Sequence, residues 1–169
     1  SLETSLEMLS TGKRINSASD DAAGVAIASR LSSEIRGTNQ SIRNALDARA
    51  LMDTAEGAHK EVENILQRMR EIAVQAANDT NNTQDRLNMQ KEINAMVNEM
   101  DRIAEATTWA GTNLLIGDGT SNSEKAFSFQ VGAATGTQNQ LNVAVKSLTA
   151  STLGLSALDL QATVLINDA

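Results

Sequence analysis

The sequence predicts a mainly α-helical fold, a long antiparallel helical hairpin of coiled-coil character with a small β-hairpin region. Apolar or small residues recur in steps of three and four through residues 20–78, at the mean spacing of one face of a supercoiled helix. These residues are Leu31, Ile35, Thr38, Ile42, Ala45, Ala48, Met52, Ala55, Ala58, Val62, Ile65, Met69, Ile72 and Ala76. The 169-residue chain has no proline to interrupt a helix, and only 2% of it is aromatic. Small and aliphatic side chains suit closely packed helices better than a ligand pocket.

A helix over residues 20–78 would reach roughly 80 Å at its usual rise per residue. No small globular core can cover a rod of that length, so its apolar face must meet other long helices. The sequence therefore favours an elongated structural protein over a compact enzyme.

The first residues predict the last turns of a preceding helix, because Leu2, Leu6 and Leu9 follow helical spacing. Gly12 is placed to cap the C-terminus of that helix. Residues 13–21 form a polar connector, and its candidate caps for the long helix are Ser17, Ser19 and Asp20. Asp20 and Asp21 also lie where the helix dipole favours negative charge.

A second helix is expected over residues 83–107, after turn-forming residues 79–83. Its apolar stripe consists of Met89, Ile93, Met96, Met100 and Ile103. The short connection should fold this helix back antiparallel on the first. Alternating residues then predict two strands, 126–131 and 141–145, joined by a loop. The state of the hydrophobic residues 153–162 is left open.

Three segments are expected: residues 1–21 as a helix end with its connector, 22–108 as the helical hairpin, and 109–169 as the β-hairpin region. The chain begins without methionine, so we expect it to be truncated. The net charge of −7 argues against binding to nucleic acid or to an anionic membrane surface. No apolar stretch is long enough for membrane insertion, and the start does not resemble a cleavable signal peptide.

No motif or residue spacing in the sequence suggests catalysis, a metal site or a cofactor site. His59 is the only histidine and lies beside the apolar stripe, where an ordinary, partly exposed role is expected. No nucleophile elbow, zinc motif or complete phosphate loop occurs. Residues 79–85 weakly resemble a calcium loop but lack its glycine, and Gln90 stands where its glutamate belongs. We expect no enzyme activity.

The charged run around Arg68, Arg70 and Glu71, with Gln67, has two interpretations. It is either an ordinary solvated helix face with intrahelical pairs or a protein–protein contact surface. Arginine suits the second role because its planar fork pairs with carboxylates.

Three separated segments resemble bacterial flagellins. Residues 9–24, LSTGKRINSASDDAAG, resemble the N-terminal signature of that family, and residues 67–78, QRMREIAVQAAN, resemble a later segment. Residues 109–115, WAGTNLL, stand where the family enters its β region. The resemblance extends from Ser1 to about Leu160.

The resemblance implies a structural subunit of the flagellar filament that self-assembles into a homopolymer for motility. It also implies a secreted, extracellular location at the bacterial flagellum, reached by type III export. The partners implied are the export apparatus, a chaperone, a cap protein and the vertebrate flagellin receptor of innate immune recognition. In the family, a long C-terminal helix completes the helical bundle.

The resemblance also implies site residues. The family segment that serves as protofilament contact and receptor surface matches Gln67, Arg68, Ile72 and Glu92 here. Ile72 stands where receptor-binding members typically carry leucine, and Met96 replaces a residue that is often polar or basic.

Three alternatives remain open at this point. One is an enzyme, because some members of the resembled family carry an inserted protease domain, although these residues lack its zinc motif. A hook–filament junction protein shares the terminal signature, although residues 67–78 favour flagellin. A flagellin-like cell-surface protein that binds polysaccharide or adheres to a host is the third, although sugar-binding platforms usually need more exposed aromatic residues than Trp109, Phe127 and Phe129.

Overall fold

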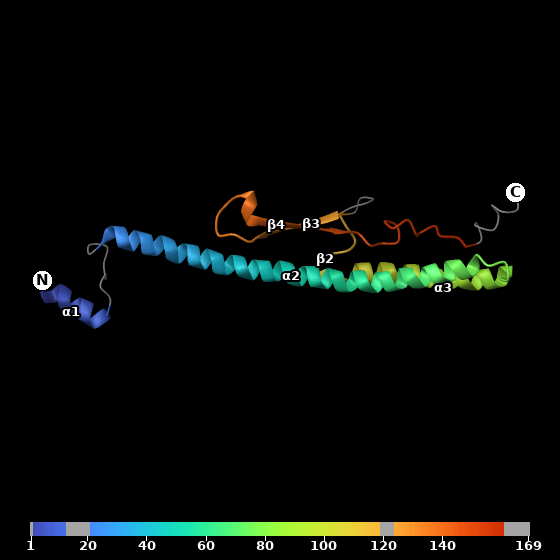
Figure 1. The fold of residues 1–169 in the computed structure, drawn as a ribbon, viewed down its shortest axis with the longest axis horizontal. Helices are drawn as coiled ribbons and strands as arrows, with labels where there is room; N and C mark the ends of the chain where they lie inside the picture. The colour runs from blue at the N-terminus through green and yellow to red at the C-terminus, as the bar shows by residue number, and fades with distance from the viewer. Residues whose placement is uncertain (1, 13–20, 119–123, 161–169) are drawn as a thin grey trace. The chain divides into compact units, whose positions relative to one another are not determined.

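The computed structural model describes residues 2–12, 21–118 and 124–160, and it is mainly helical (Figure 1). Its elements are helices α1 (Leu2–Thr11), α2 (Ala22–Ala76) and α3 (Thr83–Ala106), and strands β1 (Thr108–Trp109), β2 (Thr112–Asn113), β3 (Glu124–Gln130) and β4 (Gln140–Lys146). A short 3-10 helix, Thr137–Asn139, precedes β4. The predicted helices are confirmed to within two residues at each described end.

Local capping residues set the helix ends. Gly12 has φ +65° and its N–H donates to the Met8 carbonyl at 3.0 Å, which confirms the predicted C-terminal cap of α1. At the start of α2 the cap is Asp21, whose Oδ1 accepts the Gly24 N–H at 2.8 Å. The predicted candidates for this cap, Ser17, Ser19 and Asp20, lie outside the described residues.

Helix α3 begins with a capping box. The Asn82 side chain accepts the Asp85 N–H at 2.9 Å, and the Asp85 carboxylate accepts the Asn82 N–H at 3.1 Å. These reciprocal bonds satisfy two backbone donors that the first helical turn leaves unpaired. The turn between α2 and α3 is therefore fixed by residues next to it in the sequence.

Contacts divide the chain into two compact units. The first comprises Ser1–Leu46 and Phe129–Leu141, and the second comprises Asp47–Ser128 and Asn142–Ala169. Helix α2 continues through the division as one 55-residue helix.

In the first unit, the connection between β3 and β4 lies against α2. Asn44 donates from Nδ2 to the Gln130 carbonyl at 2.8 Å. A Cβ added to Gly37 would lie 2.9 Å from the Ala133 Cβ, so a side chain at residue 37 would force the loop away. Glycine at residue 37 therefore permits this close approach.

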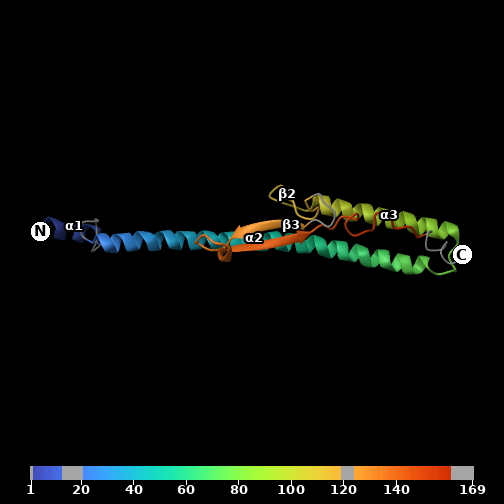
Figure 2. The ribbon, with the colours of Figure 1, turned by 90° about the horizontal axis from the view of Figure 1, so that it is seen from above.

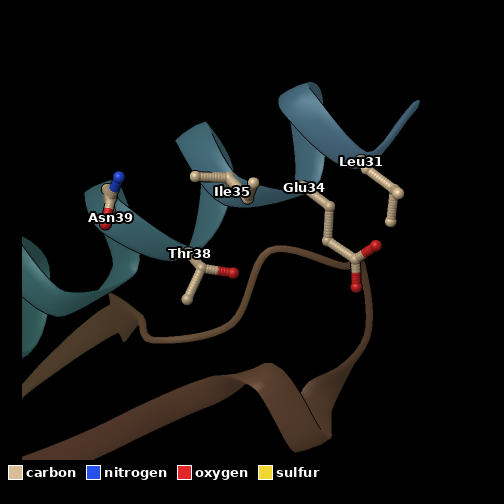
Figure 3. A pocket seen from close by; sticks show the side chains of 5 residues that line it. All are labelled: Leu31, Glu34, Ile35, Thr38 and Asn39. Atoms are coloured by element: carbon tan, nitrogen blue, oxygen red, sulfur yellow. The ribbon is translucent and has the colours of Figure 1, made fainter. Parts of the chain in front are cut away.

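The apolar stripe of α2 is exposed in this first unit. Leu31, Ile35 and Ile42 have 48%, 61% and 55% of their surface exposed. Among the described residues nothing covers this face, so the predicted packing of the stripe against other long helices is not seen in this unit. An open groove of about 350 Å³ follows the stripe, and its side chains lie on successive turns of α2 (Figure 3): Leu31, Glu34, Ile35, Thr38 and Asn39.

In the second unit, the stripe is buried. The core cluster joins the facing sides of α2 and α3, with Leu160 added from the C-terminal segment; its members are Val62, Met69, Ile72, Ala76, Met89, Ile93, Met100 and Leu160. Ile93 and Met100 are fully buried, as the α3 stripe predicts. Nearer the N-terminus of this unit, the predicted Ala48 and Ala55 are buried, at 0% and 6% exposure. Leu51 is also buried, at 1%, whereas the predicted Met52 is 39% exposed.

Among its described residues, the β region contains two two-stranded sheets, β1–β2 and β3–β4. The strands β3 and β4 confirm the predicted pair at 126–131 and 141–145. The β1–β2 hairpin was not predicted, and its two turn residues, Ala110 and Gly111, both have positive φ, at 49° and 78°. Positive φ at both positions matches the type I′ turn that short hairpins prefer.

Candidate protein–protein contact surface

Arg68 links the two helices of the second unit on their exposed side. Its Nη2 lies 3.1 Å from Glu92 Oε1 on α3, and its Nη1 lies 3.1 Å from Glu71 Oε2, one turn along α2. The hydrogen bonds to Glu71 and then to Glu92 raise the pKa of the Arg68 guanidinium above its ordinary value. The guanidinium is thus a fixed positive charge between two carboxylates, held at the surface.

This arrangement keeps its polar groups accessible. The side chains of Arg68, Glu71 and Glu92 remain 54%, 69% and 45% exposed. Gln67 is also exposed, and its Nε2 reaches Glu63 Oε1 at 3.4 Å. Exposed ion pairs contribute little to folding stability. The charged and amide groups of this surface are therefore available to a protein partner.

Ile72 lies differently from the other three expected contact residues. It is 1% exposed and belongs to the core cluster between α2 and α3. In this chain its side chain can support the surface by packing, one helical turn from Arg68, but it presents almost no area to a partner. Of the four expected residues, the structure therefore brings Gln67, Arg68 and Glu92 to the surface.

The residues named for possible chemistry do not assemble into a site in the described part of the chain. His59 is exposed on α2. No group of three or more histidine, cysteine, aspartate or glutamate side chains able to hold a metal occurs among the described residues. Within the same residues, no helix combines the length and apolarity needed to cross a membrane.

Sequence reasoning missed a buried arginine at the turn between α2 and α3. Arg86 is 9% exposed, its Nη2 lies 3.4 Å from the Asn78 carbonyl oxygen and 3.8 Å from Asp79 Oδ1, and its buried Nε has no hydrogen-bond partner. Asp79 itself is fully exposed. The position of Arg86 directly after Asp85, the last residue of the capping box, is the signal that could have drawn attention to it.

It also missed two polar residues of α3 that hold the C-terminal segment. Asp101 Oδ1 accepts the Ala150 N–H at 2.7 Å. Gln90 donates to the Leu158 carbonyl and accepts the Leu160 N–H, both at 2.8 Å. Neither residue stands out in the sequence, because each partner is a backbone group 49 to 70 residues away.

The fold and this surface define a helical structural protein whose exposed features suit contact with other proteins. Residues 1–120 match the family model described as the bacterial flagellin N-terminal helical region. The chain belongs to the bacterial flagellin family.

Individual relatives agree with this assignment. Polar flagellin F of Vibrio parahaemolyticus is 47% identical over 145 residues, which cover 84% of this chain and 36% of that protein. A flagellin of Salmonella typhimurium is 42% identical over 167 residues, which cover 99% of this chain and 32% of that protein. The chain thus spans about a third of the length of these relatives.

A solved structure agrees as well. FliC from Burkholderia pseudomallei matches with a TM-score of 0.52 and 31% sequence identity, over 61% of this chain and 38% of that one. The mainly helical fold with a small β region is therefore the fold expected for this family.

Proposed function

We propose that the protein containing this chain is a structural subunit of the bacterial flagellar filament, which self-assembles into a homopolymer outside the cell. The observation that carries the proposal is the unburied apolar face of α2, formed by Ile27, Leu31, Ile35, Ile42 and Leu46, each about half exposed or more. A contiguous exposed apolar helix face of this kind marks a site of contact with other helices, in the same subunit or in a neighbouring one. Membership of the flagellin family supports the same function.

Electron microscopy tests the proposal on the full-length protein. Under polymerising salt, filaments are expected from the full-length protein, and monomers from this 169-residue chain alone. A full-length protein that stays monomeric, or forms only short capped ends, would overturn the filament function and favour a junction or surface-binding role.

We propose further that Gln67, Arg68 and Glu92 form a contact surface, with Ile72 supporting it from the core. Two partners fit: the neighbouring subunit of a protofilament and the vertebrate flagellin receptor. The surface offers one guanidinium between two carboxylates, which suits a partner with its own charged or amide side chains. Export apparatus, chaperone and cap protein are the remaining partners expected of a secreted filament subunit.

Paired variants test this surface. Arg68→Ala in the full-length protein should lower receptor binding and filament yield, whereas Arg43→Ala should leave both unchanged. Arg43 is a matched control because it is exposed on the same helix and hydrogen-bonds only within it, to Gln40. Equal effects of the two variants, or no effect of either, would refute the assignment. Circular dichroism of both variants checks that the helices are intact.

A further inference from the structure

Residues 147–160, which we call the strap, follow β4 and form a string of turns in the second unit. The strap satisfies much of its own backbone. Leu153 and Leu155 donate to the Thr149 and Ala150 carbonyls at 3.1 and 2.8 Å, and Leu158 donates to Leu155 at 3.2 Å. The strap is therefore a locally organised segment rather than part of a helix or a sheet.

Hydroxyl groups tighten its first turn. Ser147, Thr149 and Thr152 form a ring of hydrogen bonds, with oxygen–oxygen distances of 3.3, 2.9 and 3.0 Å. The Thr152 N–H also approaches Thr149 Oγ1, at 3.4 Å. These contacts all lie within the strap, so they hold its shape without fastening it to the helices.

Two side chains of α3 fasten the strap to the helical hairpin. Asp101 accepts the Ala150 N–H at one end, and Gln90 pairs with both Leu158 and Leu160 at the other, each bond 2.7 to 2.8 Å long. Asp101 and Gln90 are eleven residues apart, about three turns, so they lie on one side of α3. The strap runs antiparallel to α3 between these two points, beside the helix in Figure 2.

Apolar contact beneath the strap is limited. Leu160 is 7% exposed in the core cluster and Ala150 is 1% exposed, whereas Leu148 and Leu155 pack against that cluster while partly exposed. Leu153 and Leu158 remain 37% and 36% exposed. The helices, by contrast, supply seven of the eight buried members of the cluster themselves.

We propose that the strap is a lid that opens and closes as a unit over an intact α2–α3 hairpin, with Gln90 and Asp101 as its two clasps. Besides the three bonds from α3, the Leu148 N–H donates to the Leu115 carbonyl at 2.9 Å. Ordering fourteen residues costs conformational entropy that a few apolar contacts and these four fastening hydrogen bonds only narrowly offset. The hairpin keeps its own core and its own capping box when the lid opens. Opening exposes part of the apolar cluster, so the subunit has an open form distinct from its unfolded form. This inference does not depend on the proposed filament function.

Hydrogen exchange of the full-length protein, followed by mass spectrometry, tests the lid. Gln90→Ala removes one clasp and Asp101→Ala removes the other, and each should speed exchange in residues 147–160 by about tenfold or more, while α2 and α3 keep their protection. Asn98→Ala is the matched control, because Asn98 is an exposed amide residue on the same helix. It should change neither region.

Thiol labelling gives a second measurement. The chain has no cysteine, so Leu155→Cys places a single reporter in the lid itself, at a partly buried side chain that packs against the core cluster. Adding Gln90→Ala should raise its labelling rate by about tenfold, and adding Asn98→Ala should not. Unchanged exchange and labelling in both clasp variants would overturn the proposal. So would equal loss of protection in the strap and in the helices, because the strap would then open only when the whole unit unfolds.

Discussion

Replacing the buried arginine at the helical turn should stabilise the protein if the replacement is apolar and of similar length. Arg86 is 9% exposed, and its Nε has no partner, which costs about 1–3 kcal/mol. The compensating contacts are weak. The bond from Nη2 to the Asn78 carbonyl is long at 3.4 Å. The Asp79 carboxylate at 3.8 Å is fully exposed, so water screens its pairing with Arg86.

Arg86→Met keeps most of the stem that packs against the core and removes the unpaired donor. The free energy of unfolding should then rise by about 1 kcal/mol. Arg86→Ala also removes the packing of the stem and should lower it by about 1–2 kcal/mol. Urea unfolding, monitored by helical circular dichroism, measures both values.

Arg70→Met provides the control, because Arg70 is exposed on α2. Its change should stay within about 0.5 kcal/mol. The reasoning is refuted if Arg86→Met destabilises the protein by about 1 kcal/mol or more, because the guanidinium bonds at the end of α2 would then outweigh its desolvation.

Three other changes test the core, the short hairpin and the surface charges. Ile93→Ala empties a fully buried position and should lower the free energy of unfolding by about 2–5 kcal/mol, whereas Ile93→Val should cost only about 1 kcal/mol in the same urea titration. Ala110→Asn should raise the melting temperature, because asparagine tolerates the positive φ of 49° better than alanine; an unchanged or lower value would contradict the type I′ interpretation. The hydrogen bond from Arg102 lowers the pKa of Glu99 below its ordinary 4.5, so the pair stabilises the fold above that pH and loses its effect as the pH falls through the lowered pKa. Arg102→Ala should therefore shift the Glu99 carboxyl titration, followed by NMR, back up towards 4.5, and an unmoved titration would refute the cause.

The helices could be predicted from sequence because their determinants are local. Periodic apolar residues, a glycine cap and the absence of proline define α1, α2 and α3 within short windows of sequence. What periodicity could not reveal is which part of the α2 stripe is covered. Ile35 and Ile72 fit one pattern, but one is 61% exposed and the other is buried, because burial depends on distant segments.

The residues of the candidate site likewise differ in how well their burial could be foreseen from the sequence. Resemblance selected four contact residues, of which the structure places Gln67, Arg68 and Glu92 at the surface and packs Ile72 inside. Two of the missed residues, Gln90 and Asp101, are polar side chains whose partners lie far along the chain. Ala110 gave no signal either, because alanine is not a residue typical of a positive φ.

The capping box at Asn82 and Asp85 has a consequence for the order of folding. It fixes the reversal between α2 and α3 over a connection of six residues, 77–82, whose closure costs little entropy. The pairing of Gln90 with Leu158 and Leu160, by contrast, joins residues 68 and 70 positions apart. Local contacts form faster than distant ones, so the helical hairpin should form first. Residues 147–160 should then pack against the preformed hairpin.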